Sequence, residues 1–155
     1  MIHNLSELGF EHEEIRYVHD PSVGLKAIIA IHDTTLGPAG GGTRRWVYKS
    51  ELDALKDALE LSKAMTLKYA IAGCDCGGGK GIIIVKDPNE RSETLYRAYA
   101  RYVDSYNGRF FTGMDVGTGE TELRWMAKET EYILSLIHIS EPTRPLYISY
   151  AVFCL

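Results

Sequence analysis

The chain has 155 residues, and 45% of them are hydrophobic, which is enough to bury the core of a single domain. Its 21 acidic and 17 basic side chains are spread along the chain and give a formal charge of −4, which argues against nucleic acid or an anionic membrane as a partner. No apolar run approaches the ~20 residues of a membrane-spanning helix, and residues 1–10 are too polar for a signal peptide. We therefore expect a cytoplasmic protein.

The cysteines and histidines do not indicate a metal site. Cys74 and Cys76 form a C-x-C pair that lacks the second cysteine or histidine pair of a zinc site. The five histidines fall on different segments, without the short spacing of ligand pairs. We interpret the three cysteines as reduced, partly buried thiols and expect no bound metal.

The first predicted elements are two strands, over residues 14–19 and 25–32. The turn-forming residues 20–24 lie between them, so the strands are expected to pair antiparallel. Residues 25–31 are apolar at nearly every position, as in a strand that is covered on both faces. We expect this strand to be central in its sheet.

A glycine-rich segment follows at residues 36–43. Gly40, Gly41 and Gly42 have no Cβ atom to keep a ligand away from the main chain, so we predict a loop that lines a site. A plain flexible turn is the alternative. Ser50 then caps a predicted helix that repeats apolar residues, Leu52 among them, at helical spacing and ends near Lys68.

The second half of the chain alternates predicted strands and helices. A glycine-rich turn at residues 77–81 carries Lys80 and leads into a buried, β-branched strand at residues 81–85. The remaining elements are a helix, a short strand and a helix, over residues 92–106, 109–112 and 120–132. Together they predict an α/β domain of three layers, in which helices flank a mixed, mostly buried sheet.

Residues 134–155 differ in character from the rest of the chain. They show no periodicity and end in a short apolar run, and they resemble a translated sequencing-adapter read-through. We therefore predict one domain over residues 1–133, followed by a non-native tail. A genuine C-terminal strand is the alternative.

The two common nucleotide-binding fingerprints are missing from the sequence. The segment before Lys80 departs from the P-loop pattern, because Cys74 stands at the first glycine and Gly81 replaces the serine or threonine that binds magnesium. No G-x-G-x-x-G turn occurs either. The chain by itself therefore has no recognisable site for NAD or ATP.

Three charged residues at the ends of predicted elements indicate a different kind of site. Lys68, Lys80 and Asp115 stand beside glycine or other small residues, and ligands of open α/β sheets bind at strand ends. A partly desolvated lysine near another cation has a lowered pKa, so one lysine can act as a general base while the other binds a carboxylate. Isolated surface lysines remain the alternative for each residue taken alone.

Five ordered motifs also resemble the Glu/Leu/Phe/Val dehydrogenase family. The motifs are residues 31–39 (IHDTTLGPA), 41–44 (GGTR), 65–68 (MTLK), 77–80 (GGGK) and 115–118 (DVGT). The similarity runs from about residue 5 to residue 132, is greatest to the leucine-specific branch, and covers the family's N-terminal substrate and dimerisation domain. It implies an NAD-dependent oxidative deamination of an L-amino acid to a 2-oxo acid and ammonia.

The resemblance also implies a role for each matching residue. Lys80 matches the lysine that activates water, and Asp115 matches the carboxylate that exchanges protons with the substrate nitrogen. Lys68 matches the lysine that binds the substrate carboxylate, with Gly41 and Gly42 as backbone lining of the same site. Met65 belongs to the Lys68 motif and is carried over as a substrate-binding residue.

The resemblance also predicts part of the substrate specificity. Gly40 stands where glutamate-specific members have a lysine, so glutamate is disfavoured, although Arg44 and Arg45 lie nearby. Leucine-specific members have leucine at this position and alanine at the position of Gly113. The two glycines therefore predict a pocket that accepts small apolar L-amino acids and their 2-oxo acids, and bulkier, even aromatic, side chains as well.

The resemblance stops before the family's nucleotide-binding Rossmann domain. Hydride transfer needs a cofactor held against the substrate, so we expect the 155-residue chain to be inactive alone and NAD to be bound mainly by the missing domain. A homo-oligomer is expected, because this domain carries the family's subunit contacts. The alternatives are a self-associating remnant without catalysis and an unrelated phosphate-binding enzyme.

Overall fold

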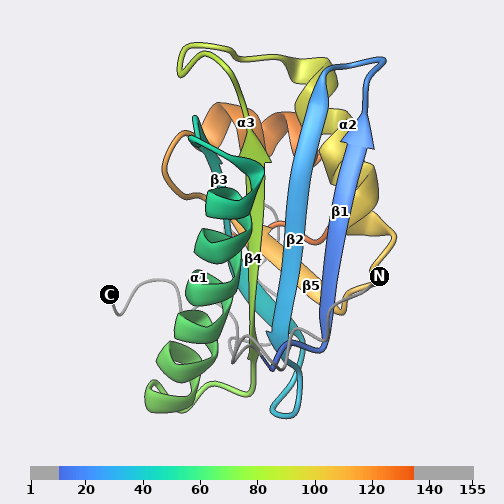
Figure 1. Ribbon diagram of the computed structural model, residues 1–155. Helices are drawn as coiled ribbons and strands as arrows, with labels where there is room; N and C mark the ends of the chain where they lie inside the picture. Colours follow the sequence, from blue (N-terminus) through green and yellow to red (C-terminus); the bar gives the residue numbers. More distant parts are fainter. Residues whose placement is uncertain (1–10, 135–155) are drawn as a thin grey trace.

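A computed structural model describes residues 11–134 and confirms the predicted three-layer α/β domain (Figure 1). One five-stranded sheet has helix α1 on one face and helices α2 and α3 on the other. The elements in chain order are β1 (Glu14–Asp20), β2 (Leu25–Asp33), β3 (Ala39–Trp46), α1 (Glu51–Ile71), β4 (Gly77–Ile84), α2 (Glu93–Asp104), β5 (Phe110–Gly113) and α3 (Glu120–Met126).

The sheet is mixed, with the strand order β1-β2-β4-β3-β5. β1, β2 and β4 pair antiparallel, whereas β3 runs parallel to both β4 and β5. The predicted antiparallel pair is therefore confirmed, with Glu14 opposite Ile31 and Asp20 opposite Leu25. β2 lies between two other strands and is almost completely buried, as its apolar sequence predicts.

Two apolar cores hold the three layers together. Ile28 and Ile82 point from the sheet to Ala58 and Leu59 of α1, and their neighbours Ile29 and Ile83 point to α2 and α3 on the other face. Each fully buried isoleucine contributes about 1.5–3 kcal/mol to folding. Consecutive residues of one strand therefore anchor opposite layers.

The helices begin where the sequence predicts and end elsewhere. Ser50 and Ser92 cap α1 and α2, each accepting a hydrogen bond from the third residue after it. α1 continues three residues past Lys68 to Ile71, and α3 ends at Met126, earlier than predicted. Leu52, which the sequence placed in the repeating apolar pattern of α1, is 58% exposed. The residues that the helix buries are Ala54, Ala58, Leu59, Ser62 and Tyr69.

The two glycine-rich segments are strands, so their prediction as a loop and a turn is wrong. Gly40 to Gly42 lie in β3, and Gly77 to Gly81 lie in β4 beside it. The physical reason is that neighbouring strands and α1 approach the backbone of these glycines too closely for a side chain to fit. A Cβ on Gly41 would lie 1.8 Å from the Gly79 carbonyl oxygen, and one on Gly78 would lie 2.2 Å from the Thr66 hydroxyl of α1.

The described chain ends beside β5. Thr112 donates its N–H to the Tyr132 carbonyl at 3.1 Å, and Leu134 donates to the Thr112 carbonyl at 2.8 Å. Of the predicted tail over residues 134–155, only Leu134 is described, and the rest lies outside the described residues. Among residues 11–134, no helix has the length and apolar character needed to cross a membrane.

Candidate functional site

Lys80 is at the centre of the candidate site. It lies in β4 opposite Ala30 of β2, and alternation along the strand turns its side chain to the face that α1 covers. Only 7% of the side chain is exposed, and its ammonium contacts the carboxylate of Asp115. Burial lowers the pKa of Lys80, and this effect outweighs the opposing charge of Asp115.

Asp115 comes from the tight loop after β5. Its N–H donates to the Thr118 carbonyl at 3.2 Å, and the Thr118 N–H donates back at 2.9 Å. Its Oδ1 accepts from the Val116 N–H at 2.6 Å, which leaves Oδ2 for Lys80. Burial raises the pKa of Asp115, but the Lys80 and Val116 donors outweigh it and hold that pKa below its ordinary value. An ionised carboxylate thus lies beside a lysine that loses its proton more easily than an exposed one.

Arg44 of β3 is the cation that the structure adds to this pair. Its Nη1 donates to Oδ2 of Asp57 on α1 at 3.0 Å, and its Nε lies 3.5 Å from Oδ2 of Asp115. The charge of Arg44 disfavours the protonated form of Lys80 and favours the ionised form of Asp115. Sequence reasoning expected a second lysine, Lys68, in this place.

The glycines of β3 form the wall of the site next to these charges. A Cβ on Gly42 would lie 2.9 Å from the Cβ of Asp115, and one on Gly40 would lie 2.6 Å from the hydroxyl of Tyr69. Both glycines therefore face the same side as Lys80. A side chain at Gly41 would point towards the main chain of β4 instead, so Gly41 can line the site only with its backbone atoms.

Lys68 and Met65 lie at the C-terminal end of α1. Their spacing of three residues puts both on one side of the helix, and both are partly buried. Within residues 11–134, Lys68 forms no ion pair, in contrast to Lys80. The structure thus brings Lys80, Asp115, Gly42 and Gly40 together and leaves the amine of Lys68 available at the edge.

Comparison with known proteins decides the family. Residues 12–132 match the sequence profile of the Glu/Leu/Phe/Val dehydrogenase dimerisation domain. The chain belongs to this family. It is 46% identical to leucine dehydrogenase of Geobacillus stearothermophilus over 127 residues, which are 82% of this chain and 35% of that protein. It is 51% identical to phenylalanine dehydrogenase of Caldalkalibacillus thermarum over 126 residues, which are 81% of this chain and 34% of that protein.

A solved structure agrees with both the family and the fold. The crystal structure of L-tryptophan dehydrogenase from Nostoc punctiforme superposes with a TM-score of 0.79 at 49% identity, over 83% of this chain and 38% of that one. The resemblance inferred from the five motifs is therefore confirmed. The chain spans about a third of the length of the curated relatives that it matches.

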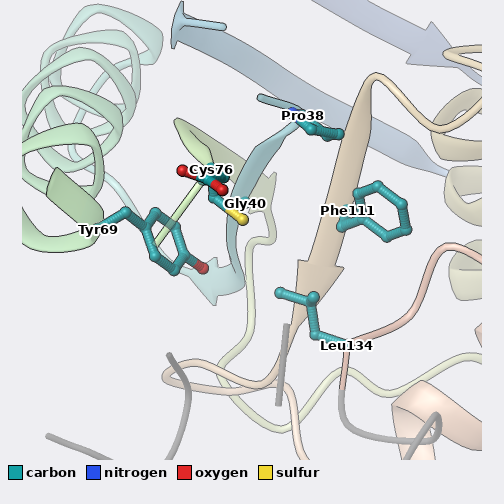
Figure 2. A pocket seen from close by; sticks show the side chains of 7 residues that line it. Pro38, Gly40, Tyr69, Cys76, Phe111 and Leu134 are labelled. Atoms are coloured by element: carbon teal, nitrogen blue, oxygen red, sulfur yellow. The ribbon is translucent and has the colours of Figure 1, made fainter. Parts of the chain in front are cut away.

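The domain has a small pocket that includes Gly40 of the site wall (Figure 2). Tyr69 projects from the α1 side with its hydroxyl toward the pocket, and Phe111 and Leu134 lie opposite. The pocket is lined by Pro38, Gly40, Tyr69, Asp75, Cys76, Phe111 and Leu134. Cys76 is a free, half-buried thiol, and burial raises its pKa. A Cβ on Gly113 would lie 3.5 Å from the Leu134 Cβ, so Gly113 borders the same wall.

Two residues of this candidate site were not assigned a role in it from the sequence: Arg44, which was noted only as part of a motif and as a charge near Gly40, and Tyr69. Arg44 follows Gly40 and Gly42 at a spacing of two, which would have placed it on the site face had the segment been recognised as a strand. Nothing in the sequence near Tyr69 indicates that it contacts Gly40. Among residues 11–134, no group of three or more histidine, cysteine, aspartate or glutamate side chains is placed to hold a metal ion.

Proposed function

We propose that this chain is the substrate-binding and oligomerisation part of a longer NAD-dependent amino-acid dehydrogenase. The enzyme would deaminate a branched-chain or other apolar L-amino acid oxidatively, to the 2-oxo acid and ammonia. The observation that carries the proposal is the buried contact between Lys80 and Asp115, on the sheet face where the absence of side chains at Gly40 and Gly42 lets Tyr69 and Asp115 approach β3. The leucine, phenylalanine and tryptophan dehydrogenases among the relatives support it.

In this proposal Lys80 is the general base. Burial lowers its pKa, so Lys80 gives up its own proton more easily than an exposed lysine, and the neutral amine can take a proton from the water that attacks the imino acid. Asp115 is ionised before the reaction, and it accepts a proton from the substrate nitrogen and later returns it. The reaction takes up one water and releases ammonia, and the two hydrogens of the C–N unit leave as a hydride and a proton.

The substrate carboxylate is assigned to the edge of the site. Lys68 keeps an amine free of ion pairs among the described residues, and we assign Gly41 and Gly42 of β3 as backbone lining of the same subsite. A charged amine is a suitable partner for a carboxylate. We assign Met65, one helical turn before Lys68, to the apolar side of the same subsite.

NAD accepts the hydride when it is bound. The sequence contains neither of the common phosphate-binding turns, so we assign the cofactor to a nucleotide domain of the parent protein and propose that this chain alone is inactive. We further propose a cytoplasmic homo-oligomer, with this domain supplying the subunit contacts. Exposed apolar side chains such as Leu52, at 58%, and Tyr17, at 48%, offer surface for them.

Substitution of the two central residues in the full-length parent enzyme tests the proposal. Lys80→Met and Asp115→Asn are each expected to lower kcat for the best amino-acid substrate by about 10²–10⁴-fold. Lys26→Met is the matched control, because Lys26 is an exposed lysine of β2 paired with Glu51 at 2.7 Å. Near-normal turnover by Lys80→Met would refute the assigned chemistry, and a control that is equally inactive would point to misfolding.

A further inference from the structure

The side chain of Tyr69 takes up the space that Gly40 leaves in the pocket. A Cβ on Gly40 would lie 2.6 Å from the Tyr69 hydroxyl and 3.0 Å from two of the ring carbons. Tyr69 comes from the last turns of α1, Gly40 comes from β3, and Tyr69 is only 4% exposed. The two positions are therefore complementary, and the glycine does not by itself make the pocket larger.

The Tyr69 hydroxyl brings a polar group into a pocket that is otherwise mostly apolar. Burial raises the pKa of Tyr69 to about 12, so the phenol stays protonated at physiological pH. Within the described part of the chain, this hydroxyl forms no side-chain hydrogen bond, and it faces the space bounded by Phe111 and Leu134 (Figure 2). The hydroxyl opens onto the pocket, so a ligand group that enters the pocket can pair with it.

The pocket lies at a defined distance from the proposed reaction centre. Gly42 borders Asp115, and Gly40 is two residues away on the same face of β3, which is roughly 7 Å at about 3.4 Å per residue. A substrate whose Cα lies at Lys80 and Asp115 reaches Tyr69 only through a long side chain. An aromatic side chain spans that distance, and a branched-chain aliphatic one does not.

The charge of the pocket restricts the ligand further. Asp75 belongs to the lining, so the carboxylate of an acidic side chain would meet a like charge there. A hydrogen-bond donor at the far end of the ligand is favoured instead, since both the phenol oxygen and a carboxylate accept hydrogen bonds. Phenol and indole side chains combine an apolar ring with such a donor.

We propose that Tyr69 is a specificity-determining residue that selects L-amino acids with an aromatic side chain bearing a hydrogen-bond donor at its edge. This inference rests on the function proposed above and narrows its substrate class. The phenol group of Tyr69 pairs with the donor of the substrate. Substrates that lack the donor leave the hydroxyl unpaired and are discriminated against, as in other sites built around a hydrogen bond.

The test compares substrates that differ in a single donor. The full-length enzyme and its Tyr69→Phe variant are assayed for kcat/KM with L-tyrosine against L-phenylalanine, and with L-tryptophan against 1-methyl-L-tryptophan. Wild type should favour the donor-bearing member of at least one pair. Tyr69→Phe should reduce that preference at least fivefold while keeping turnover of L-phenylalanine. Equal ratios in both enzymes, or a preference for L-leucine that the substitution does not change, would overturn the inference.

A second test moves side-chain volume from position 69 to position 40. Gly40→Leu alone should abolish activity on aromatic substrates, because the new side chain collides with Tyr69. Adding Tyr69→Ala removes the collision and should restore turnover, now with L-leucine. A double variant as inactive as Gly40→Leu, in soluble and folded protein, would contradict the complementarity of the two positions. An active enzyme in which Lys80→Met retains turnover would instead refute the proposed function itself, so the two failures are distinguishable.

Discussion

Nε of Arg44 lies 3.5 Å from Oδ2 of Asp115, while Nη1 of the same guanidinium donates to Asp57 of α1. Asp57 also accepts a 2.5 Å hydrogen bond from the hydroxyl of Tyr48. Arg44 therefore links three parts of the fold, namely β3, α1 and the loop after β5. It forms an ion pair with Asp115 and adds a positive charge next to Lys80.

Replacing Arg44 should alter the pH dependence of the reaction. In Arg44→Gln the pKa of Lys80 rises, because a like charge is lost, and the pKa of Asp115 rises, because an opposite charge is lost. The limb of the kcat/KM profile that reports the neutral amine should therefore move to higher pH. We expect kcat/KM at pH 7 to fall on the order of tenfold to a hundredfold.

A surface arginine provides the control for that experiment. Arg97→Gln removes an ion pair with Glu129 on the opposite side of the sheet, and its pH profile should match wild type. An unshifted profile in Arg44→Gln would mean that Arg44 has only a structural role.

The next residue, Arg45, should affect stability rather than chemistry. Its buried guanidinium donates to the carbonyls of Gly117, Pro88 and Glu90 at 2.9, 2.8 and 2.6 Å. Arg45→Met keeps the apolar stem but leaves three carbonyls without their donor. We expect the free energy of unfolding to fall by about 2–4 kcal/mol, measured by urea denaturation. A loss below about 0.5 kcal/mol would show that water replaces the guanidinium without cost.

The close contact between Gly81 and Tyr99 predicts a coupled pair of substitutions. A Cβ on Gly81 would lie 2.0 Å from the Tyr99 hydroxyl, which also accepts a hydrogen bond from Thr43 at 3.1 Å. Gly81→Ala should cost about 1–3 kcal/mol of stability through overpacking, and Tyr99→Phe about 1 kcal/mol through the lost hydrogen bond. The double variant should be more stable than the sum of the two losses implies, because the colliding oxygen is gone.

Gly113→Ala is the matched comparison for the Gly81 substitution. Its Cβ would make an ordinary contact, 3.5 Å from the Cβ of Leu134, and stability should change little. Strict additivity of Gly81→Ala and Tyr99→Phe would rule out the collision as the cause of the loss.

Two adjacent histidines should make the domain sensitive to mild acid. The rings of His12 and His32 lie 4.9 Å apart, and His32 Nδ1 is 2.9 Å from the Thr66 hydroxyl. Burial lowers the pKa of both, so below pH 6.5 the unfolded chain binds protons that the folded chain does not. The free energy of unfolding therefore decreases as the pH falls from about 6.5 towards the lowered folded pKa.

Urea midpoints at pH 7.5 and 5.5 measure this effect. His32→Asn should lose part of the difference between the two midpoints, whereas His19→Asn, at an exposed site on β1, should keep it. Equal pH sensitivity in His32→Asn and wild type would show that other groups cause the acid response.

Local features of the sequence were sufficient to predict most of the secondary structure. The turn at residues 20–24 joins β1 to β2, Ser50 and Ser92 cap their helices, and α2 is followed by Asn107 and Gly108, both at positive φ. Each signal acts within a few residues, through backbone preference or a short hydrogen bond, so it can be recognised in the printed sequence. Lys80 and Asp115 were picked out in the same way, as charged residues among small ones at the ends of predicted elements, but the structure places Lys80 in the middle of β4 and not at its end.

Only the tertiary structure showed that the glycines allow close packing between elements, and which side chains contact one another. The same residues that permit a turn also permit strands and helices to approach within contact distance, and only the packed neighbours distinguish these uses. Gly40 meets Tyr69, and Arg44 meets Asp115, across long stretches of chain. Such contacts depend on the register of β3 between β4 and β5 and on the packing of α1 against the sheet, which no local pattern encodes.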